Sequence, residues 1–342
     1  MCVLVLVCAL ALPLPVAAQG PTGPFGLAAL LDDRAILDRL ELRLSGLSPA
    51  PDGSAYRVWL RSDDLSLVQP AGDVPIDANG DGLFAWTQPA GEALFIQFSE
   101  ILVTLEPGAP GLQPGPIVLR GQVDPGALTQ LRRLLVRWPD SRYGTASLQG
   151  LRQLTANTVV QAAVLREAAT TGDLVGMRRK AEHLVNLVEG SRGAGFGDLD
   201  GDGRAEDPGD GVGLLPYMWG ALTQTQFAWA GAVDEQVAEA SLSVQPPLRF
   251  ALDWVGFVRD SGLELTQTQD PARARELAGH LLTAVQRIAA TVDPGTDPTL
   301  VQMAGQREFN PAYQTALGLV QVALLPPGAA GAVITGSGAD GG

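Results

Sequence analysis

The chain has 342 residues, of which 46% are hydrophobic, enough to fill the cores of two ordinary domains and too many for a disordered chain. It carries 37 acidic against 23 basic residues, a formal net charge of -14, and contains no basic block. Because such a chain has no patch that could neutralise phosphates, we expect no nucleic-acid partner.

The N-terminus predicts export. The first 31 residues carry no charged side chain, and an apolar run ends in the small residues Val16-Ala17-Ala18. This pattern is typical of a secretory signal peptide, residues 1–18, although the usual positively charged start is missing. The alternative is a leader retained as a membrane anchor. Pro13 and Pro15 disfavour it, so we expect no permanent membrane span in the mature chain.

Both cysteines, Cys2 and Cys8, lie within this leader. A mature exported protein without them has no disulfides, so it must rely on the size of its core or on bound ions. We therefore predict a secreted or cell-surface protein.

Residues 32–123 have the pattern of short strands. Apolar and polar residues alternate in LELRLSGL (residues 40–47) and in YRVWL (56–60), and glycine or proline separates such segments. This period of two, with frequent turns, predicts an antiparallel β-sandwich.

The same region resembles a known family. The order LSGLSPAPDGSAYRVWL, DANGDGLFAW and FSEILVTLEPGAPGLQPGPIVLRG, within residues 36–122, resembles the extracytoplasmic domain of anti-sigma-K factors. The resemblance covers about a quarter of the chain and implies an all-β extracytoplasmic module. The cytoplasmic sigma-binding region and the internal membrane helix of that family have no counterpart here, so regulation of a sigma factor is not implied.

From Asp124-Pro125 onward the apolar spacing becomes helical, which predicts an all-α helical bundle over residues 124–325. Asp270-Pro271 and Asn310-Pro311 are typical helix starts. A Gly/Ala-rich tail, 326–342, is predicted to be disordered. The expected helices cover residues 128–138, 145–170, 173–190, 214–242, 246–267, 270–292 and 310–325.

Aromatic residues recur on two of these helices. Trp219, Phe227 and Trp229 lie on one, and Trp254 and Phe257 lie on the next. Helical spacing of large apolar side chains favours core positions, with a ligand pocket as the alternative.

The segment GDLDGDGRAEDPGDG, residues 197–211, predicts a calcium-binding loop within the bundle. Asp198, Asp200 and Asp202 occupy positions 1, 3 and 5 of such a loop, Gly203 occupies position 6, and Arg204 offers its carbonyl at position 7. Calcium binds through several oxygen ligands, which alternating carboxylates and a sharp glycine turn supply.

The loop departs from the EF-hand at its end. Gly209 stands where the EF-hand has a bidentate glutamate, so we expect the closing carboxylate from Glu206, Asp207 or Asp210. The alternative is a solvated turn, because Asp and Gly are common turn residues. The excess of negative charge favours a cation.

A second, weaker calcium pattern is DANGDG, which contains Asp77, Asn79 and Asp81. No carboxylate follows until Glu92, and a tight turn between two strands accounts for the same residues.

The two histidines suggest a different metal. His183 and His280 lie on predicted helices, and Glu276 precedes His280 by one turn on the same face. If these helices pack together, the three side chains could hold a transition metal or a haem. The alternative is that each histidine is an ordinary packed or exposed residue.

No motif for catalysis is visible: the sequence has no nucleophile elbow, no phosphate-binding glycine loop and no HExxH helix. A carboxylate pair for glycan cleavage stays open, because many acids are present. We therefore predict a non-catalytic, extracytoplasmic binding or envelope-associated protein with a calcium-ordered loop. The alternative function is transition-metal or haem binding, and the partner, an unknown protein or envelope component, is not specified by the sequence.

Overall fold

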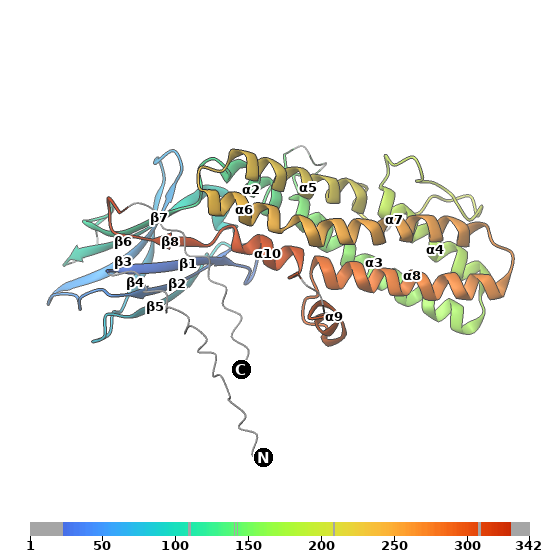
Figure 1. The fold of residues 1–342 in the computed structure, drawn as a ribbon, viewed down its shortest axis with the longest axis horizontal. Helices are drawn as coiled ribbons and strands as arrows, with labels where there is room; N and C mark the ends of the chain where they lie inside the picture. The colour runs from blue at the N-terminus through green and yellow to red at the C-terminus, as the bar shows by residue number, and fades with distance from the viewer. Residues whose placement is uncertain are drawn as a thin grey trace, which may run out of the picture.

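The computed structural model describes residues 23–329 apart from 109–110, 140, 142, 208 and 307–308. Its N-terminal part consists of two packed antiparallel sheets of four strands each, which lie at one end of an elongated molecule (Figure 1). The strands are β1 (Phe25–Leu31), β2 (Arg39–Ser45), β3 (Ser54–Ser62), β4 (Val68–Val74), β5 (Gly82–Thr87), β6 (Phe98–Pro107), β7 (Ile117–Gln122) and β8 (Val322–Leu324). One helical turn, α1 (Leu94–Gln97), precedes β6.

The strand orders are β5-β2-β1-β8 and β4-β3-β6-β7, which confirms the predicted β-sandwich. In β2 the predicted alternation of apolar and polar residues is matched by burial: Leu40, Leu42 and Leu44 are buried, and the residues between them are not. Single antiparallel bridges, Ile76 to Gly82 and Arg120 to Leu325, join the two sheets at both edges. The eight strands thus approach a closed ring, which shields strand edges that would otherwise be unpaired.

A buried carboxylate stabilises the second sheet. Glu106 accepts hydrogen bonds from Trp59 Nε1 at 3.2 Å, Thr104 Oγ1 at 2.5 Å and the Gly115 N–H at 2.9 Å. Burial raises the pKa of Glu106, but these hydrogen bonds outweigh burial and leave the pKa below its usual value.

The last strand of the sandwich comes from the other end of the chain. Strand β8 pairs with β1, with Val322 opposite Ala28 and Leu324 opposite Gly26. The structure therefore differs from the helix predicted over 310–325, and the sandwich begins before residue 32. Val322 and Leu324 are buried and alternate with less buried neighbours, and the open edge of β1 supplies their backbone partners.

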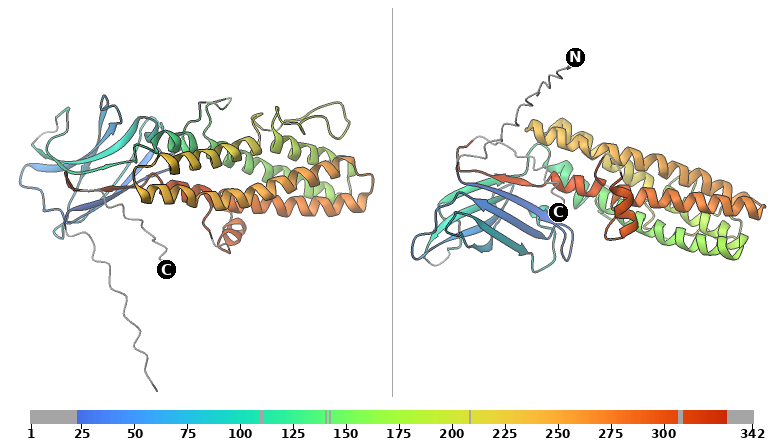
Figure 2. Two further views of the ribbon diagram at one scale, coloured as in Figure 1. Left: turned by 45° about the horizontal axis from the view of Figure 1, so that its top comes forward. Right: turned by 60° about the horizontal axis from the view of Figure 1, so that its bottom comes forward.

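The remaining described residues form nine helices, which confirms the predicted helical region after the sandwich. Four long helices pack in the ring α3-α4-α7-α8, with α5 against α2, α3 and α6 (Figures 1 and 2). The helices are α2 (Leu128–Leu135), α3 (Ser147–Thr171), α4 (Leu174–Glu189), α5 (Leu214–Gly231), α6 (Glu235–Ser243), α7 (Gln245–Gln267), α8 (Pro271–Val292), α9 (Pro298–Ala304) and α10 (Ala312–Gly318).

The helix predicted over 214–242 is two helices, and one side chain explains the break. Asp124 Oδ1 accepts the N–H groups of Gly126 and Ala127 at 2.8 and 3.0 Å, and Oδ2 accepts those of Val233 and Asp234 at 2.9 and 2.8 Å. The carboxylate thus supplies the partners that the interrupted helix lacks. It also ties the end of the sandwich to two helical segments.

The sandwich and the helices share one apolar core, since Leu42 of β2 and Leu281 of α8 belong to the same connected cluster. A polar network reinforces the junction. Arg152 of α3 contacts Asp32, next to β1, at 3.1 Å, and Tyr313 of α10 donates its hydroxyl to Asp32 at 2.8 Å. The two parts are therefore packed as one body, although their sequence patterns differ.

Most of the aromatic residues expected in the core are on the surface. Trp219, Phe227 and Trp229 of α5 are 55%, 53% and 43% exposed, and Phe257 of α7 is 39% exposed. Trp254 is partly buried. The buried face of α5 is formed by Leu214, Tyr217, Met218 and small residues such as Ala221, and the other three rings of this helix lie outside that face.

Within the described residues, none of the helices has the length and apolarity needed to span a bilayer. The predicted signal peptide, residues 1–18, lies outside the described residues, as does the predicted tail from residue 330 onward. Pro326 to Ala329 are described and form a turn in which the Ala329 N–H donates to the Pro326 carbonyl.

Candidate metal site in the acidic loop

The acidic loop joins α4 to α5 and is closed at its base. The N–H and hydroxyl groups of Ser191 both donate to the Gly211 carbonyl, at 3.0 and 2.9 Å. Asp210 accepts the Val212 N–H at 2.9 Å and the Tyr217 hydroxyl at 2.6 Å. Burial and the Asp210 carboxylate raise the pKa of Tyr217, so its hydroxyl stays protonated and continues to donate.

The calcium-type spacing forms the expected sharp turns. Asp198 Oδ1 accepts the Gly201 N–H at 2.8 Å, and its Oδ2 accepts the Gly203 N–H at 2.9 Å. Asp200 accepts the Asp202 N–H at 3.0 Å. Both glycines have positive φ, 81° and 88°, a conformation that favours glycine. The backbone of the loop is thus held by its own carboxylates.

Glu182 of α4 is the ligand candidate that the sequence did not reveal. Its side chain is buried, and it accepts the N–H groups of Leu199 and Asp200 at 2.8 and 3.1 Å through one oxygen and that of Glu206 at 3.1 Å through the other. Asn186, one turn further along, accepts the Gly197 N–H at 3.0 Å. A glutamate facing the core beside His183 was the available signal, because a buried carboxylate requires partners.

Glu182, Asp198 and Asp200 form a group in which one ligand oxygen from each lies within 4.8 Å of the others. Oxygens bound to one calcium lie about 2.3 to 2.6 Å from the ion, so they are separated by less than about 5.2 Å. The three carboxylates therefore fit a single hard cation. Their donor set of oxygen atoms suits Ca²⁺ better than a soft metal.

The other predicted loop ligands have different partners. The Asp202 carboxylate contacts Arg179 at 3.1 Å, and Asp207 accepts the Gly209 N–H at 2.9 Å. Arg204 donates its N–H to Asp202 at 3.0 Å.

Basic residues of α4 lie against the loop. Arg178 donates to the Asp200 carbonyl at 2.9 Å and to the Thr266 carbonyl at the end of α7 at 2.6 Å. Together with Arg179, which pairs with Asp202, and Lys180, which lies near Glu206, it offsets part of the loop's negative charge. The Arg178 contacts also fix the loop relative to α7.

His183 pairs with the loop rather than with His280. Its Nε2 contacts Glu206, and its Nδ1 lies 3.0 Å from Lys180 Nζ. Burial and the Lys180 ammonium lower the pKa of His183 despite Glu206, so the ring is neutral at pH 7. We assign the proton to Nε2, since Lys180 is a donor.

The other members of the predicted transition-metal set lie elsewhere. His280 is exposed on α8, with its ring centre 6.5 Å from that of Phe257, and Glu276 pairs with Arg273 at 2.8 Å. Among the described residues, the one group of three metal-ligand side chains is Glu182, Asp198 and Asp200. The structure therefore does not bring His183, Glu276 and His280 into such a group.

The second calcium pattern is a tight turn that carries the chain from one sheet to the other. Asp77 Oδ1 accepts the N–H groups of Asn79 and Asp81 at 2.8 and 2.9 Å, and these hydrogen bonds lower the pKa of Asp77. Asp77 and Asp81 belong to no group of three His, Cys, Asp or Glu ligands among the described residues. The turn geometry accounts for the pattern.

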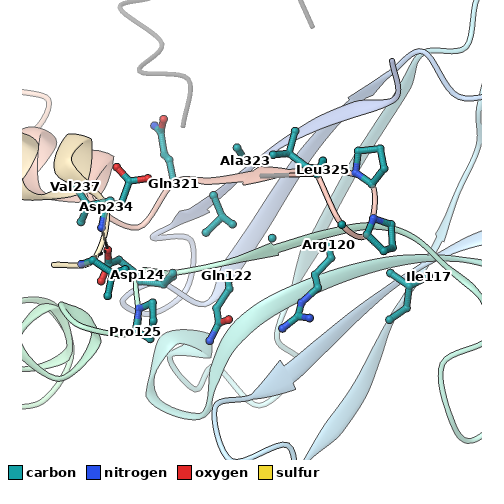
Figure 3. Close-up of a pocket in the computed structure, with 18 of the residues that line it drawn as sticks. Ile117, Arg120, Gln122, Asp124, Pro125, Asp234, Val237, Gln321, Ala323 and Leu325 are labelled. Atoms are coloured by element: carbon teal, nitrogen blue, oxygen red, sulfur yellow. Dashed lines mark hydrogen bonds between the residues drawn. The ribbon is translucent and has the colours of Figure 1, made fainter. Parts of the chain in front are cut away.

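A groove of about 580 Å³ lies where the sandwich meets the helices, between β7, β8 and α6 (Figure 3). Its charged groups already have partners. Asp124 holds four N–H groups, Asp234 caps α6 through the Gln236 N–H at 2.8 Å, and Arg120 pairs with Glu100. The acidic loop is thus the stronger candidate for binding.

Comparisons with protein-family models, with curated proteins and with solved structures found no match for this chain. The resemblance of residues 36–122 to anti-sigma-K extracytoplasmic domains therefore stays a prediction. The assignment of a bound ion rests on the geometry of the site itself.

Proposed function

We propose that this is a non-catalytic, extracytoplasmic binding protein whose acidic loop is ordered by one calcium ion held by Glu182, Asp198 and Asp200. The observation that carries the proposal is the buried position of Glu182, which brings a helix carboxylate to the two loop carboxylates. Calcium would supply positive charge to a site that is rich in oxygen ligands.

Electrostatics favours a cation at this place. Two carboxylates about 4 Å apart repel each other by about 4 kcal/mol at an effective dielectric constant of about 20. Backbone N–H groups offset part of this repulsion, because each of the three carboxylates accepts at least one. A divalent ion would remove the rest and would fasten the loop to α4.

The extracytoplasmic part of the proposal rests on the sequence. The apolar leader, the cysteine-free remainder of the chain and the resemblance of the sandwich all favour export. Outside the cell, calcium reaches about millimolar concentration, where even a weak site is occupied and stabilises the folded chain. We infer that the ion has a structural role and that the bound partner contacts another surface.

The test compares two substitutions that remove the same charge from the same loop. Asp200→Ala removes a proposed ligand oxygen, whereas Asp207→Ala removes a carboxylate outside the group of three, and each substitution removes one turn acceptor. Thermal unfolding is measured with calcium and with chelator. We expect calcium to stabilise the wild type and Asp207→Ala, but not Asp200→Ala. Equal calcium stabilisation of all three proteins would refute the proposal.

A further inference from the structure

A second groove lies on the helical bundle, away from the acidic loop. It has a volume of about 530 Å³ and lies between α3, the end of α8 and the start of α9. One wall is aliphatic and consists of Ala156, Val159, Ala289, Val292 and Leu300. This volume and this wall suit a small ligand with an aliphatic chain.

The positive charge in the groove is already neutralised. Arg152 Nε donates to Asp293 at 2.6 Å, and Arg152 Nη1 contacts Asp32 at 3.1 Å. The Arg152 guanidinium also lies 3.6 Å from the centre of the Tyr313 ring. Arg152 thus pairs with two carboxylates, and Asp297 adds a third carboxylate at the rim of the groove. The balance of charge around the groove is negative.

One carboxylate oxygen of Asp297 is available to a ligand. Its Oδ1 caps α9 by accepting the N–H groups of Thr299 and Leu300 at 2.8 and 3.2 Å. Its Oδ2 makes no hydrogen bond or ion pair within the described part of the chain. The side chain is exposed at the mouth of the groove, where a ligand can reach it.

Two further features point to a ligand that donates hydrogen bonds. Thr155 lines the groove, and its hydroxyl is buried, at 3% exposure of the residue, with no partner among the described residues. Helix α8 ends at Val292 in the same wall, so its carbonyl end directs partial negative charge toward this place. A buried hydroxyl without a partner is unfavourable, and a bound donor would satisfy it.

From these features we propose that the groove binds a small aliphatic primary amine, with its ammonium group at Asp297 and its carbon chain against the aliphatic wall. The carboxylates and the helix end attract the cation, while the apolar wall takes up the chain. The Thr155 hydroxyl accepts a hydrogen bond from the ligand or from a water that the ligand holds.

The experiment uses the full chain and three probes of equal length: n-hexylamine, 1-hexanol and hexanoate. Binding is followed by calorimetry or by NMR shifts. We expect the amine to bind at least tenfold more tightly than the alcohol, and hexanoate to bind more weakly still. Equal affinity for amine and alcohol would overturn the proposal, because the carboxylates would then contribute nothing.

Two variants locate the site. Asp297→Asn keeps a good helix cap but removes the charge, and we expect at least a fivefold loss of amine affinity with no change for 1-hexanol. Asp234→Asn is the matched control, since Asp234 caps α6 in the other groove. It leaves amine binding unchanged. Unchanged amine affinity in Asp297→Asn, with the circular dichroism of the wild type, would also overturn the proposal.

Discussion

The Glu182→Gln substitution separates two roles of this side chain. In the wild type, the two carboxylate oxygens accept three loop N–H groups. Glutamine retains one acceptor oxygen, so its Nε2 faces a buried N–H group, which costs about 1 to 3 kcal/mol. Removal of one of three neighbouring carboxylates offsets part of this loss when no ion is bound. We therefore expect a modest destabilisation in chelator.

Bound calcium is expected to widen the stability difference between the wild type and Glu182→Gln. If the wild-type site has a dissociation constant of about 10 μM, 1 mM calcium stabilises the folded state by about 2.7 kcal/mol. For a chain of this size that corresponds to roughly 5 °C in Tm, at about 2 °C per kcal/mol. Glu182→Gln replaces a proposed ligand carboxylate with a neutral amide whose single oxygen also accepts the loop N–H groups, so we expect calcium to raise its Tm by less than about 1 °C.

The assay is thermal unfolding of each protein in 1 mM calcium and in chelator, conditions chosen for about hundredfold saturation. Glu167→Gln, an exposed position on α3, controls for the loss of one carboxylate and keeps the full calcium shift. A calcium shift of the same size in Glu182→Gln and in the wild type would refute the assignment of Glu182 as a ligand. The substitution would then act only through its hydrogen bonds.

Three further predictions concern the fold. Asp124→Asn leaves two of its four N–H partners, which are buried or partly buried, without an acceptor. We expect urea denaturation to show a loss of about 3 kcal/mol in the free energy of unfolding, and a loss below about 0.5 kcal/mol would contradict this expectation. Glu106→Gln is less stable than the wild type at pH 7. Because the pKa of Glu106 is lowered in the folded state, the extra stability of the wild type is present above the unfolded-state pKa of about 4.3. It is lost as the pH falls through the folded-state pKa. A stability difference that does not depend on pH would contradict this. Gly150→Ala places a methyl group 2.1 Å from the Tyr217 ring, so we expect it to lower Tm. Gly279→Ala, whose added methyl group would have no such neighbour within 4 Å, is expected to raise Tm slightly. The opposite order of Tm values would contradict the close contact between Gly150 and Tyr217.

Local patterns predicted the elements that are stabilised by their own periodicity. The alternation at Leu40, Leu42 and Leu44 is enough to define a half-buried strand, and Asp270-Pro271 is enough to start α8. Strand β8 could not be predicted in this way. By their own pattern, the apolar residues Val322 to Leu324 fit a helix as well as a strand. They form a strand because they pair with the edge of β1, which lies almost 300 residues away in the sequence.

The candidate metal site, too, could be predicted only in part from local sequence patterns. The spacing of Asp198, Asp200 and Asp202 revealed the loop, because those residues act through local turns. Glu182 and the pairing of His183 with Glu206 depend on how the loop folds back on α4, which no local pattern records. The histidine hypothesis required two helices to present their imidazoles to each other, and sequence periodicity does not fix that orientation.

The most direct test of the calcium assignment is calorimetric titration of the chelator-treated full chain with calcium. We predict one site per chain, a much weaker response to magnesium, and loss of the calcium signal in Asp198→Ala. An absence of calcium binding at millimolar concentration, or an unchanged isotherm in Asp198→Ala, would contradict the account and leave the loop as a solvated turn.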